Sequence, residues 1–408
     1  MFHRSISSYL SKAWEQFPVV VLTGARQVGK TTLARHFLPG AGYVTLDVLG
    51  ESEQARLTPM QFLGKHKRPL IIDEVQYAPS LFREIKILVD QDRRPGQFLL
   101  TGSQGFSLMD NVSESLAGRN AILRLPALGL PELASVPALP PAALTSEFLW
   151  RGGFPEFWKT PGLDRNLWFG SYVSAYLERD VRNVLNIGNL RDFNRLLRAL
   201  ALRAGQVLSH AALARDVGVS PNTAKSWISI LETSDQIFLL EPYHRQRTKR
   251  LVKSPKVYFC DTGLLAYLMG FNQAEEIPRH ALHGAIWENL VVAETRKLFL
   301  SAGQRPPLWY WRTSEGHEVD LLVECAPEIF VTVECKTAAR VTASDCAHLK
   351  TLRAEYGPAS VRKAYVACRS EHAYPLDEGG LCEAVPLAGE DGLLWRLENM
   401  PALGATKT

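Results

Sequence analysis

The chain has 408 residues, a length that predicts two or three domains rather than one. Its 46% apolar and 22% charged residues are typical of a globular protein with sizeable cores. The net charge of +4 is mildly basic and does not by itself indicate a partner. No apolar run is long enough to cross a membrane and no signal-peptide pattern opens the chain, so we expect a cytoplasmic protein without a membrane partner.

The number and spacing of the cysteines also lead us to expect a cytoplasmic protein. The six cysteines contain no C-x-x-C pair, which argues against a zinc site, and none precedes Cys260, so no disulfide framework runs through the chain. We therefore expect all six to be reduced thiols in a cytoplasm: Cys260, Cys325, Cys335, Cys346, Cys368 and Cys382.

The first predicted helix spans Ser5–Gln16, and the apolar run Val19–Leu22 predicts a short buried strand. The residues that follow match the phosphate-binding loop G-x-x-x-x-G-K-[ST]. Its glycines let backbone N–H groups wrap a polyphosphate, and the next helix points its positive end at the same anion. We expect Lys30 to reach the β- and γ-phosphates of ATP and the Thr31 hydroxyl to bind Mg²⁺. The predicted nucleotide-binding residues of this loop are Gly24, Ala25, Arg26, Gln27, Val28, Gly29, Lys30, Thr31 and Thr32.

Two further strands are expected to complete the ATP site, after a strand candidate at Tyr43–Val48. An apolar strand ends in Asp73 and Glu74, where Asp73 would hold Mg²⁺ and Glu74 would orient the attacking water. The next strand, Gln97–Ser103, ends in small polar residues, so Thr101 or Ser103 could sense the γ-phosphate. The alternative is that this end is a simple turn.

Arg119 follows the third of these strands. Its position suggests a cation offered to phosphate, either within the same chain or to a neighbouring chain. A role in the neighbouring chain would imply a homo-oligomeric ring. The alternative is a solvated surface charge.

These motifs together resemble a family of prokaryotic AAA+-type ATPases in which a C-terminal domain of unknown function follows the ATPase core. The resemblance implies a P-loop fold and ATP hydrolysis, and it brings no biological role. The segments that carry it are 24–32, 72–76, 100–103, 116–119, 152–156, 176–180 and 258–264.

The middle of the chain has the pattern of a winged helix. Three helices are predicted over 190–204, 208–217 and 222–232, followed by strands over 237–243 and 256–260. The third helix would place Trp227, Ile228 and Leu231 in a core. Four polar residues of the same helix would face a nucleic acid: Asn222, Thr223, Lys225 and Ser226. A basic wing would contact phosphates through Arg245, Arg247, Lys249, Arg250 and Lys253. The alternative is a packing or oligomerisation module.

The C-terminal region predicts an α-β-β-β-α-β order and resembles the PD-(D/E)-x-K nuclease core. Asp320 on one strand and Glu334 on the next would bind Mg²⁺, and Lys336 would stabilise the developing phosphate charge. Glu288 on the preceding helix could add a ligand or act as a base. Two alternatives stay open, namely a nuclease-like fold that only binds DNA and a structural network of ion pairs.

The sequence thus predicts an α/β protein with three parts: a P-loop, AAA+-like ATPase domain at 1–145 with a parallel sheet, a helical and winged-helix segment at 146–275, and a small α/β restriction-endonuclease-like domain at 276–408. We expect ATP hydrolysis with Mg²⁺, coupled to binding of nucleic acid, with DNA favoured, and Mg²⁺-dependent DNA cleavage by the third domain is left open. The alternative is a nucleotide-switched regulatory or interaction protein whose nuclease-like domain is catalytically idle.

Overall fold

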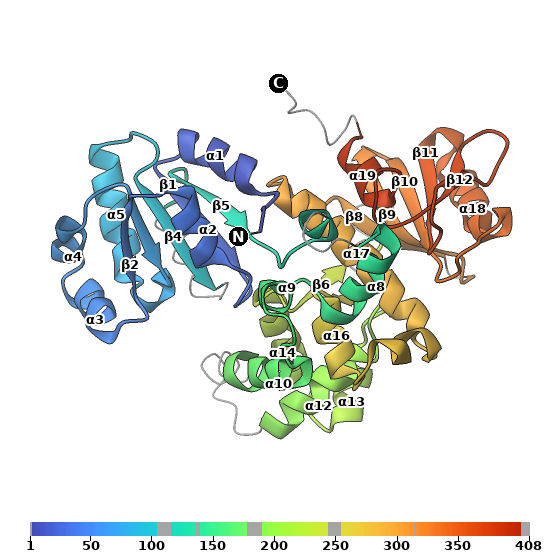
Figure 1. Cartoon of the computed structure of the whole chain (residues 1–408), viewed down its shortest axis with the longest axis horizontal. Coiled ribbons are helices and arrows are strands. Elements are labelled where there is room, and N and C mark those ends of the chain that lie inside the picture. The colour runs from blue at the N-terminus through green and yellow to red at the C-terminus, as the bar shows by residue number, and fades with distance from the viewer. Residues whose placement is uncertain are drawn as a thin grey trace.

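The computed structural model describes residues 2–103, 116–134, 139–177, 190–243, 254–313 and 315–400. Three units follow one another along the chain: an N-terminal unit (2–134), a helical unit (139–279) and a C-terminal unit (283–400). Figure 1 shows the N-terminal sheet in blue at the left, the helical unit in green and yellow at the bottom, and the C-terminal sheet in orange and red at the upper right.

The N-terminal unit is built on a parallel sheet with the strand order β2-β3-β4-β1-β5. Its strands are β1 (Val19–Gly24), β2 (Gly42–Thr45), β3 (Leu70–Asp73), β4 (Phe98–Ser103) and β5 (Asn120–Arg124). Its helices are α1 (Ser7–Gln16), α2 (Lys30–Phe37), α3 (Leu49–Leu57), α4 (Pro59–Lys65), η1 (Val75–Tyr77), α5 (Ser80–Gln91) and α7 (Leu130–Leu133). The predicted strand at 43–48 is shorter, because the chain turns after Thr45 and enters α3.

Strand β1 lies inside this sheet and is buried along its whole length, as its apolar run predicts. Its side chains alternate between two cores. Val19 and Val21 pack with residues of α4 and α5, whereas Val20 and Leu22 pack with residues of α1 and α2. The second of these cores continues into the helical and C-terminal units, so the three units share one apolar interior.

The helical unit contains the three helices and two strands that the sequence predicts in its middle. Its elements are α8 (Pro141–Arg151), α9 (Pro155–Lys159), α10 (Arg165–Tyr172), a π-helix (Val173–Leu177), α12 (Leu190–Ala201), α13 (His210–Val217), α14 (Pro221–Thr233), β6 (Ile237–Leu240), β7 (Lys256–Phe259), α16 (Thr262–Leu268) and η3 (Ala274–Arg279). Strand β6 ends at Leu240, earlier than predicted, and pairs antiparallel with β7. The predicted basic wing, 245–253, lies outside the described residues.

Helix α14 has the start and the two faces that its sequence predicts. The Ser220 hydroxyl accepts a hydrogen bond from the backbone N–H of Thr223 at 3.0 Å, and Pro221 is the first helical residue. Trp227, Ile228 and Leu231 are buried, as predicted. On the opposite face, Asn222 and Lys225 are exposed, and Thr223 and Ser226 are half-buried.

Two motifs that are distant in sequence meet where the helical unit joins the N-terminal unit. The Asp261 carboxylate accepts hydrogen bonds from the backbone N–H of Gly153 at 2.7 Å and of Leu264 at 2.9 Å. Gly152 has a φ of +73°, and a Cβ there would overlap the Asp261 carboxylate. The glycines of the 152–156 motif are therefore needed for close packing against the 258–264 motif.

Replacing Gly263 with alanine is expected to destabilise the fold. A Cβ at this position would lie 2.3 Å from the carbonyl oxygen of Arg151, so the backbone of one segment would have to move. Overpacking of this kind costs about 1–3 kcal/mol of the free energy of unfolding. Thermal denaturation measures the effect, with Gly284→Ala as the control, because a Cβ at Gly284 would meet no atom within 4 Å. Equal midpoints for the two variants would contradict the expectation.

The C-terminal unit has a mixed sheet with the strand order β12-β13-β11-β10-β9-β8. Its elements are α17 (His283–Ser301), β8 (Leu308–Arg312), β9 (Glu318–Ala326), β10 (Ile329–Cys335), η4 (Ala343–Cys346), α18 (Ala347–Tyr356), η5 (Pro358–Ser360), β11 (Val361–Ala367), β12 (Tyr374–Pro375), β13 (Cys382–Val385) and α19 (Leu393–Glu398). The α-β-β-β-α-β order is confirmed, and β12, β13 and α19 extend it. Helix α17 contacts β5, α8 and β10 and so joins all three units.

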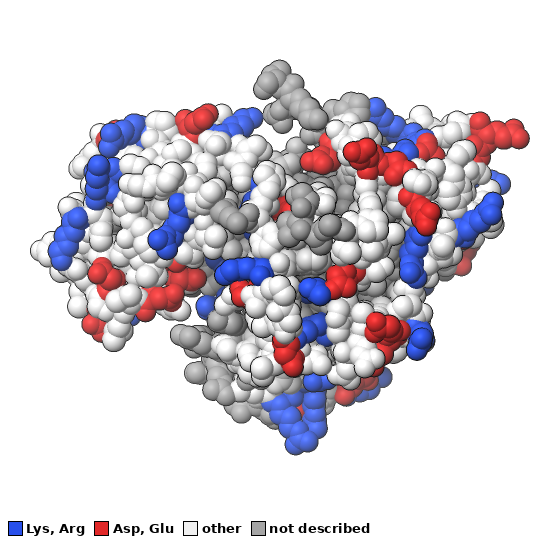
Figure 2. Space-filling view, viewed as in Figure 1, with Lys and Arg blue, Asp and Glu red and all other residues white. Residues whose placement is uncertain are grey.

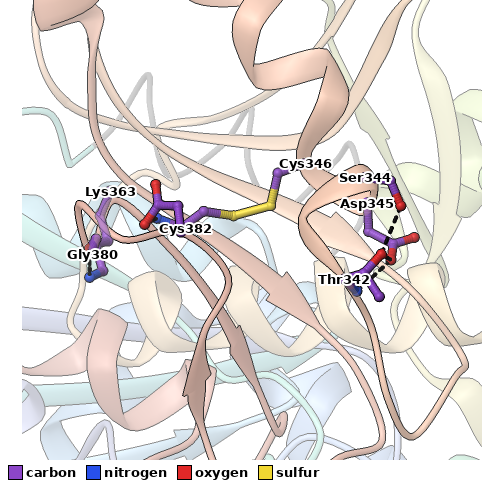
Figure 3. The surroundings of a disulfide bond; sticks show 8 residues. Thr342, Ser344, Asp345, Cys346, Lys363, Gly380 and Cys382 are labelled. Carbon is purple, nitrogen blue, oxygen red and sulfur yellow. Dashed lines mark hydrogen bonds between the residues drawn. A yellow bond between two sulfur atoms is a disulfide. The ribbon is translucent and has the colours of Figure 1, made fainter.

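The cysteines differ in part from the prediction. Cys346, at the end of η4, forms a disulfide with Cys382, the first residue of β13, with a Cα–Cα distance of 7.2 Å (Figure 3). The expectation of six reduced thiols is therefore wrong for this pair, which the fold brings together across 36 residues of sequence. Cys260, Cys325, Cys335 and Cys368 are free. In the described ranges, no helix is long and apolar enough to span a membrane.

Candidate functional site

The predicted phosphate loop connects the end of β1 to the start of α2. Gly24 and Gly29 have φ values of +148° and +95°, and a Cβ at Gly24 would lie 2.2 Å from the carbonyl oxygen of Leu125. Only glycine fits this turn without displacing the backbone. The Lys30 ammonium is buried and donates to the carbonyl oxygens of Gly24 at 3.0 Å and Ala25 at 2.8 Å. The Lys30 side chain thus connects the end of the loop to the backbone at its start.

A cavity of about 970 Å³ opens in front of this loop. It is lined by Arg26, Gln27, Gly29, Lys30, Thr31 and Thr32. Two other predicted loop residues, Ala25 and Val28, instead point into the apolar core. Leu128 and two residues of α9, Glu156 and Lys159, also line the cavity. The cavity therefore lies between the N-terminal and helical units.

Asp73 is buried at the end of β3, and its carboxylate is hydrogen-bonded by three hydroxyl groups. Its carboxylate accepts hydrogen bonds from Thr31 at 2.9 Å, from Tyr43 at 3.2 Å and from Thr101. Burial and the Asp73 carboxylate raise the pKa of the Tyr43 phenol. A hydroxyl beside a carboxylate is an oxygen donor set that suits Mg²⁺, so Thr31 and Asp73 fit the ion predicted for them. When bound, Mg²⁺ would neutralise charge on the β- and γ-phosphates.

Glu74 follows Asp73 and lines the same cavity. Its backbone is left-handed, with a φ of +55°, which is uncommon for a residue with a side chain. The Gln76 amide donates to the Glu74 carboxylate and also to the Ser103 hydroxyl at 3.2 Å. Ser103, one of the two predicted phosphate sensors, is thereby connected to the predicted water-orienting acid. Sequence analysis assigned Gln76 no role, although it lies only two residues beyond Glu74.

Arg119 does not lie at this site. It precedes β5, and its carbonyl oxygen accepts a hydrogen bond from the N–H of Val19, the first residue of β1. The phosphate loop leaves the other end of β1, so Arg119 is at the opposite edge of the sheet. Its guanidinium binds Asp90 through two hydrogen bonds of 2.6 and 3.0 Å. The expected phosphate contact within the same chain is therefore wrong, whereas a contact with a neighbouring chain stays a prediction.

Arg4 is a buried residue next to the phosphate loop, and sequence analysis assigned it no role. Its guanidinium donates to the Val28 carbonyl oxygen inside the phosphate loop at 2.8 Å and to the Pro126 carbonyl oxygen at 2.6 Å. It also pairs with Glu132, whose carboxylate accepts hydrogen bonds from the backbone N–H of Ser5 and Gly129. No local pattern marks Arg4, because its partners lie far along the chain.

The same network reaches the long helix of the C-terminal unit. On α17, the Glu294 carboxylate accepts a hydrogen bond from the backbone N–H of Leu130 at 2.7 Å. Lys297 pairs with Glu294 at 2.7 Å and donates to the Leu128 carbonyl oxygen at 3.0 Å. Buried polar contacts therefore run from the phosphate loop through Arg4, Glu132 and segment 128–130 to α17.

A second predicted site lies on the paired strands β9 and β10 of the C-terminal sheet. Asp320 and Glu334 lie on these adjacent strands, and an Asp320 oxygen accepts a hydrogen bond from the Cys335 N–H at 2.8 Å. Burial and then the Asp320 charge raise the pKa of Glu288 and of Glu334, and the nearby Lys336 charge opposes the shift of Glu334. The structure thus brings Glu288 and Lys336 near the carboxylates of Asp320 and Glu334.

Three residues missed by sequence analysis complete this acid cluster. The Lys256 ammonium of β7 contacts Glu288 at 2.8 Å and Glu318, and the Tyr258 hydroxyl donates to Glu288 at 2.5 Å. Over the ranges that the structure describes, no three His, Cys, Asp or Glu side chains are grouped so that they could hold a metal ion. The predicted Mg²⁺ ligands of this domain, Glu288, Asp320 and Glu334, therefore do not form a three-ligand group in this arrangement, and Glu288 is paired with Lys256 instead.

Comparison with known protein families matches three segments of the chain, one in each of the three units of the fold. Residues 16–134 match an AAA domain, and residues 143–275 and 283–388 match two domains of unknown function, DUF8612 and DUF4143. Uncharacterised proteins of Mycobacterium bovis and Mycobacterium tuberculosis are each 32% identical to the chain over 378 residues, which cover 92% of the chain and 82% of each relative.

Matches among solved structures include a Walker-type ATPase of Pyrococcus abyssi, with a TM-score of 0.45 and 18% identity, covering 66% of this chain and 96% of that one. A RuvB variant of Thermotoga maritima has a TM-score of 0.30 and 20% identity, covering 57% and 88%. The matched AAA domain and the parallel sheet with its phosphate loop support ATP binding and hydrolysis at the N-terminal cavity.

Proposed function

This chain belongs to the family of the two mycobacterial proteins, and from that premise and its AAA domain we propose that it couples ATP hydrolysis to DNA binding by the helical unit. At the ATP site, Lys30 would contact the β- and γ-phosphates, Thr31 and Asp73 would hold Mg²⁺, and Glu74 would orient water. Ser103 would report on the γ-phosphate through Gln76, because one amide touches both Ser103 and Glu74.

The observation that carries the DNA-binding proposal is the arginine face of α12. Arg191, Arg195 and Arg198 are exposed at a spacing that places them on one side of the helix. The other side packs Phe193 and Leu197 into the core. Figure 2 shows basic side chains gathered at the lower tip of the molecule, where Figure 1 places α12 and α13. Arginines on one helix face suit contacts with successive phosphates.

Helix α14 of the same unit offers a second polar surface. Its exposed Asn222 and Lys225 are the side chains that the sequence assigns to contact with nucleic acid. Amide and ammonium groups donate hydrogen bonds to phosphate oxygens and base edges. Together, α12 and α14 support DNA as the partner.

The test replaces the arginine face and follows DNA affinity. Changing Arg191, Arg195 and Arg198 to glutamine should weaken binding of a fluorescent duplex at least about tenfold and should reduce the slope of affinity against salt by about three, one for each lost phosphate contact. The control makes the same charge change on the N-terminal unit, with Arg56, Lys65 and Arg83 replaced by glutamine, all of them exposed. Equal losses in both variants would contradict a specific DNA face.

A second candidate function is favoured by the buried contacts between the phosphate loop and α17. Because Arg4, Glu132 and Glu294 join these elements, a nucleotide-dependent movement of the loop would reach the C-terminal unit. In that case the protein is a nucleotide switch, and duplex DNA should leave its ATPase rate unchanged. A DNA-coupled ATPase should instead be stimulated by DNA, so rates with and without duplex separate the two. We do not propose DNA cleavage, because Lys256 is paired with Glu288 and the described carboxylates of the cluster do not form a three-ligand group.

A further inference from the structure

The acid cluster of the C-terminal unit is neutralised by a residue that does not belong to that unit. Lys256 is the first residue of β7 in the helical unit, and its side chain is only 3% exposed. Its ammonium contacts both Glu288 on α17 and Glu318 on β9. An ammonium in contact with two carboxylates is paired with them as a cation, so the lysine balances charge in the cluster.

Lys256 is held in place by surrounding backbone and side chains. Its own residue pairs with Leu240 of β6 and bridges to Val207. The side chain of Asn289 on α17 makes two hydrogen bonds, of 2.8 and 3.0 Å, to the backbone of Phe259, three residues after Lys256. Since Asn289 neighbours Glu288, these bonds fix β7 against the helix that carries the acid. The backbone that carries the lysine is therefore held beside the cluster.

One carboxylate oxygen in this cluster has no partner. Glu334 is 7% exposed, and its Oε1 is buried without a hydrogen-bond partner among the described residues. A buried carboxylate oxygen without a partner is costly, so it marks a place where a cation or donor would be stabilised. Val333 of β10 pairs with Leu321 of β9, so Glu334 lies opposite Asp320 in the sheet. Glu318 is two residues before Asp320 and therefore on the same face, which places Glu334 on the face whose Glu318 contacts Lys256.

We propose that Lys256 is the resident cation of the C-terminal acid cluster and that it keeps divalent metal ions out of a site that the carboxylates would otherwise form. A divalent ion of the size of Mg²⁺ or Mn²⁺ needs several oxygen ligands at a distance of about 2.0–2.1 Å for Mg²⁺, so it competes with the ammonium for the same oxygens. Removing the lysine leaves buried carboxylates without compensation, which favours uptake of a cation. This proposal does not depend on DNA binding by the helical unit.

Mn²⁺ binding to the full-length protein tests the proposal by electron paramagnetic resonance of free Mn²⁺, without nucleotide. All proteins carry Asp73→Asn, which silences the metal site of the phosphate loop. With Lys256 present, no Mn²⁺ should bind at the cluster up to about 1 mM. Lys256→Gln should bind one Mn²⁺ per chain at least about tenfold more tightly than this limit, and adding Glu334→Gln should abolish that binding.

Lys256→Arg is the matched control, because it keeps the positive charge and should behave like the native residue. Mn²⁺ binding by the native or the Lys256→Arg protein that is lost with Glu334→Gln would overturn the proposal, and these two proteins decide it even when Lys256→Gln does not fold. A folded Lys256→Gln protein, shown by circular dichroism, that takes up no Mn²⁺ would also overturn it.

Discussion

Replacing Lys30 with alanine is expected to lower the kcat/KM of ATP hydrolysis by about 10²–10³-fold, the size of effect seen when one electrostatic contact to a transition state is removed. The ammonium is buried in the loop and donates to the carbonyl oxygens of Gly24 and Ala25. With nucleotide bound, it would turn to the β- and γ-phosphates, where charge develops. The variant therefore loses both the hydrogen bonds of Lys30 to the loop backbone and the cation of the reaction.

The measurement is steady-state release of ADP, together with binding of a fluorescent ATP analogue. Lys65→Ala is the matched control, because Lys65 is exposed on α4 and does not line the cavity. Thermal denaturation shows whether the loop still folds without its lysine. A Lys30→Ala protein that keeps more than half of the native rate would place hydrolysis at another site.

The phosphate loop could be predicted because its chemistry is local. A strand, a glycine turn and a helix start occur within a short segment, and each residue acts on the same phosphate. Asp73 and Ser103 were more remote, yet parallel strands bring their C-terminal ends to one edge of the sheet, so the strand order was enough. Their partners Tyr43 and Gln76 depend on side-chain directions that no spacing rule fixes.

Arg119 shows where this reasoning fails. It follows the sensor strand in sequence, but it precedes β5, and the beginning of a parallel strand lies at the edge away from the phosphates. Residues 104–115, which connect β4 to this point, lie outside the described residues. The position of Arg119 in the sequence, shortly after the sensor strand, therefore suggested the edge of the sheet with the phosphates, whereas the residue lies at the opposite edge.

Contacts between the units could not be predicted from the sequence, for a different reason. Arg4 and Glu132 are 128 residues apart, and Lys256 comes from a strand that the sequence assigned to a separate domain from Asp320. Each residue alone has the pattern of an ordinary surface charge. The disulfide between Cys346 and Cys382 was likewise missed, because β13 has only four residues and lies beyond the elements that the sequence predicted.

Replacing Glu74 with glutamine should separate hydrolysis from nucleotide binding. An amide has nearly the shape of the carboxylate and can still bond the Gln76 amide, but it cannot take a proton or orient water as an anion does. The expected kcat is lower by about 10²–10⁴-fold, the usual contribution of a general base, while ATP affinity changes less than about twofold. Single-turnover hydrolysis and equilibrium binding measure the two quantities.

Glu53→Gln is the matched control, because Glu53 is an exposed acid on α3. A parallel loss of ATP binding in Glu74→Gln would instead assign Glu74 a structural role in its left-handed turn, whereas an unchanged kcat would remove it from the reaction. If the expectation holds, the variant stays in the ATP-bound state, and DNA affinity can then be compared with and without ATP. A change in that affinity would demonstrate coupling between the ATP site and the helical unit, because ligand effects at two sites are reciprocal.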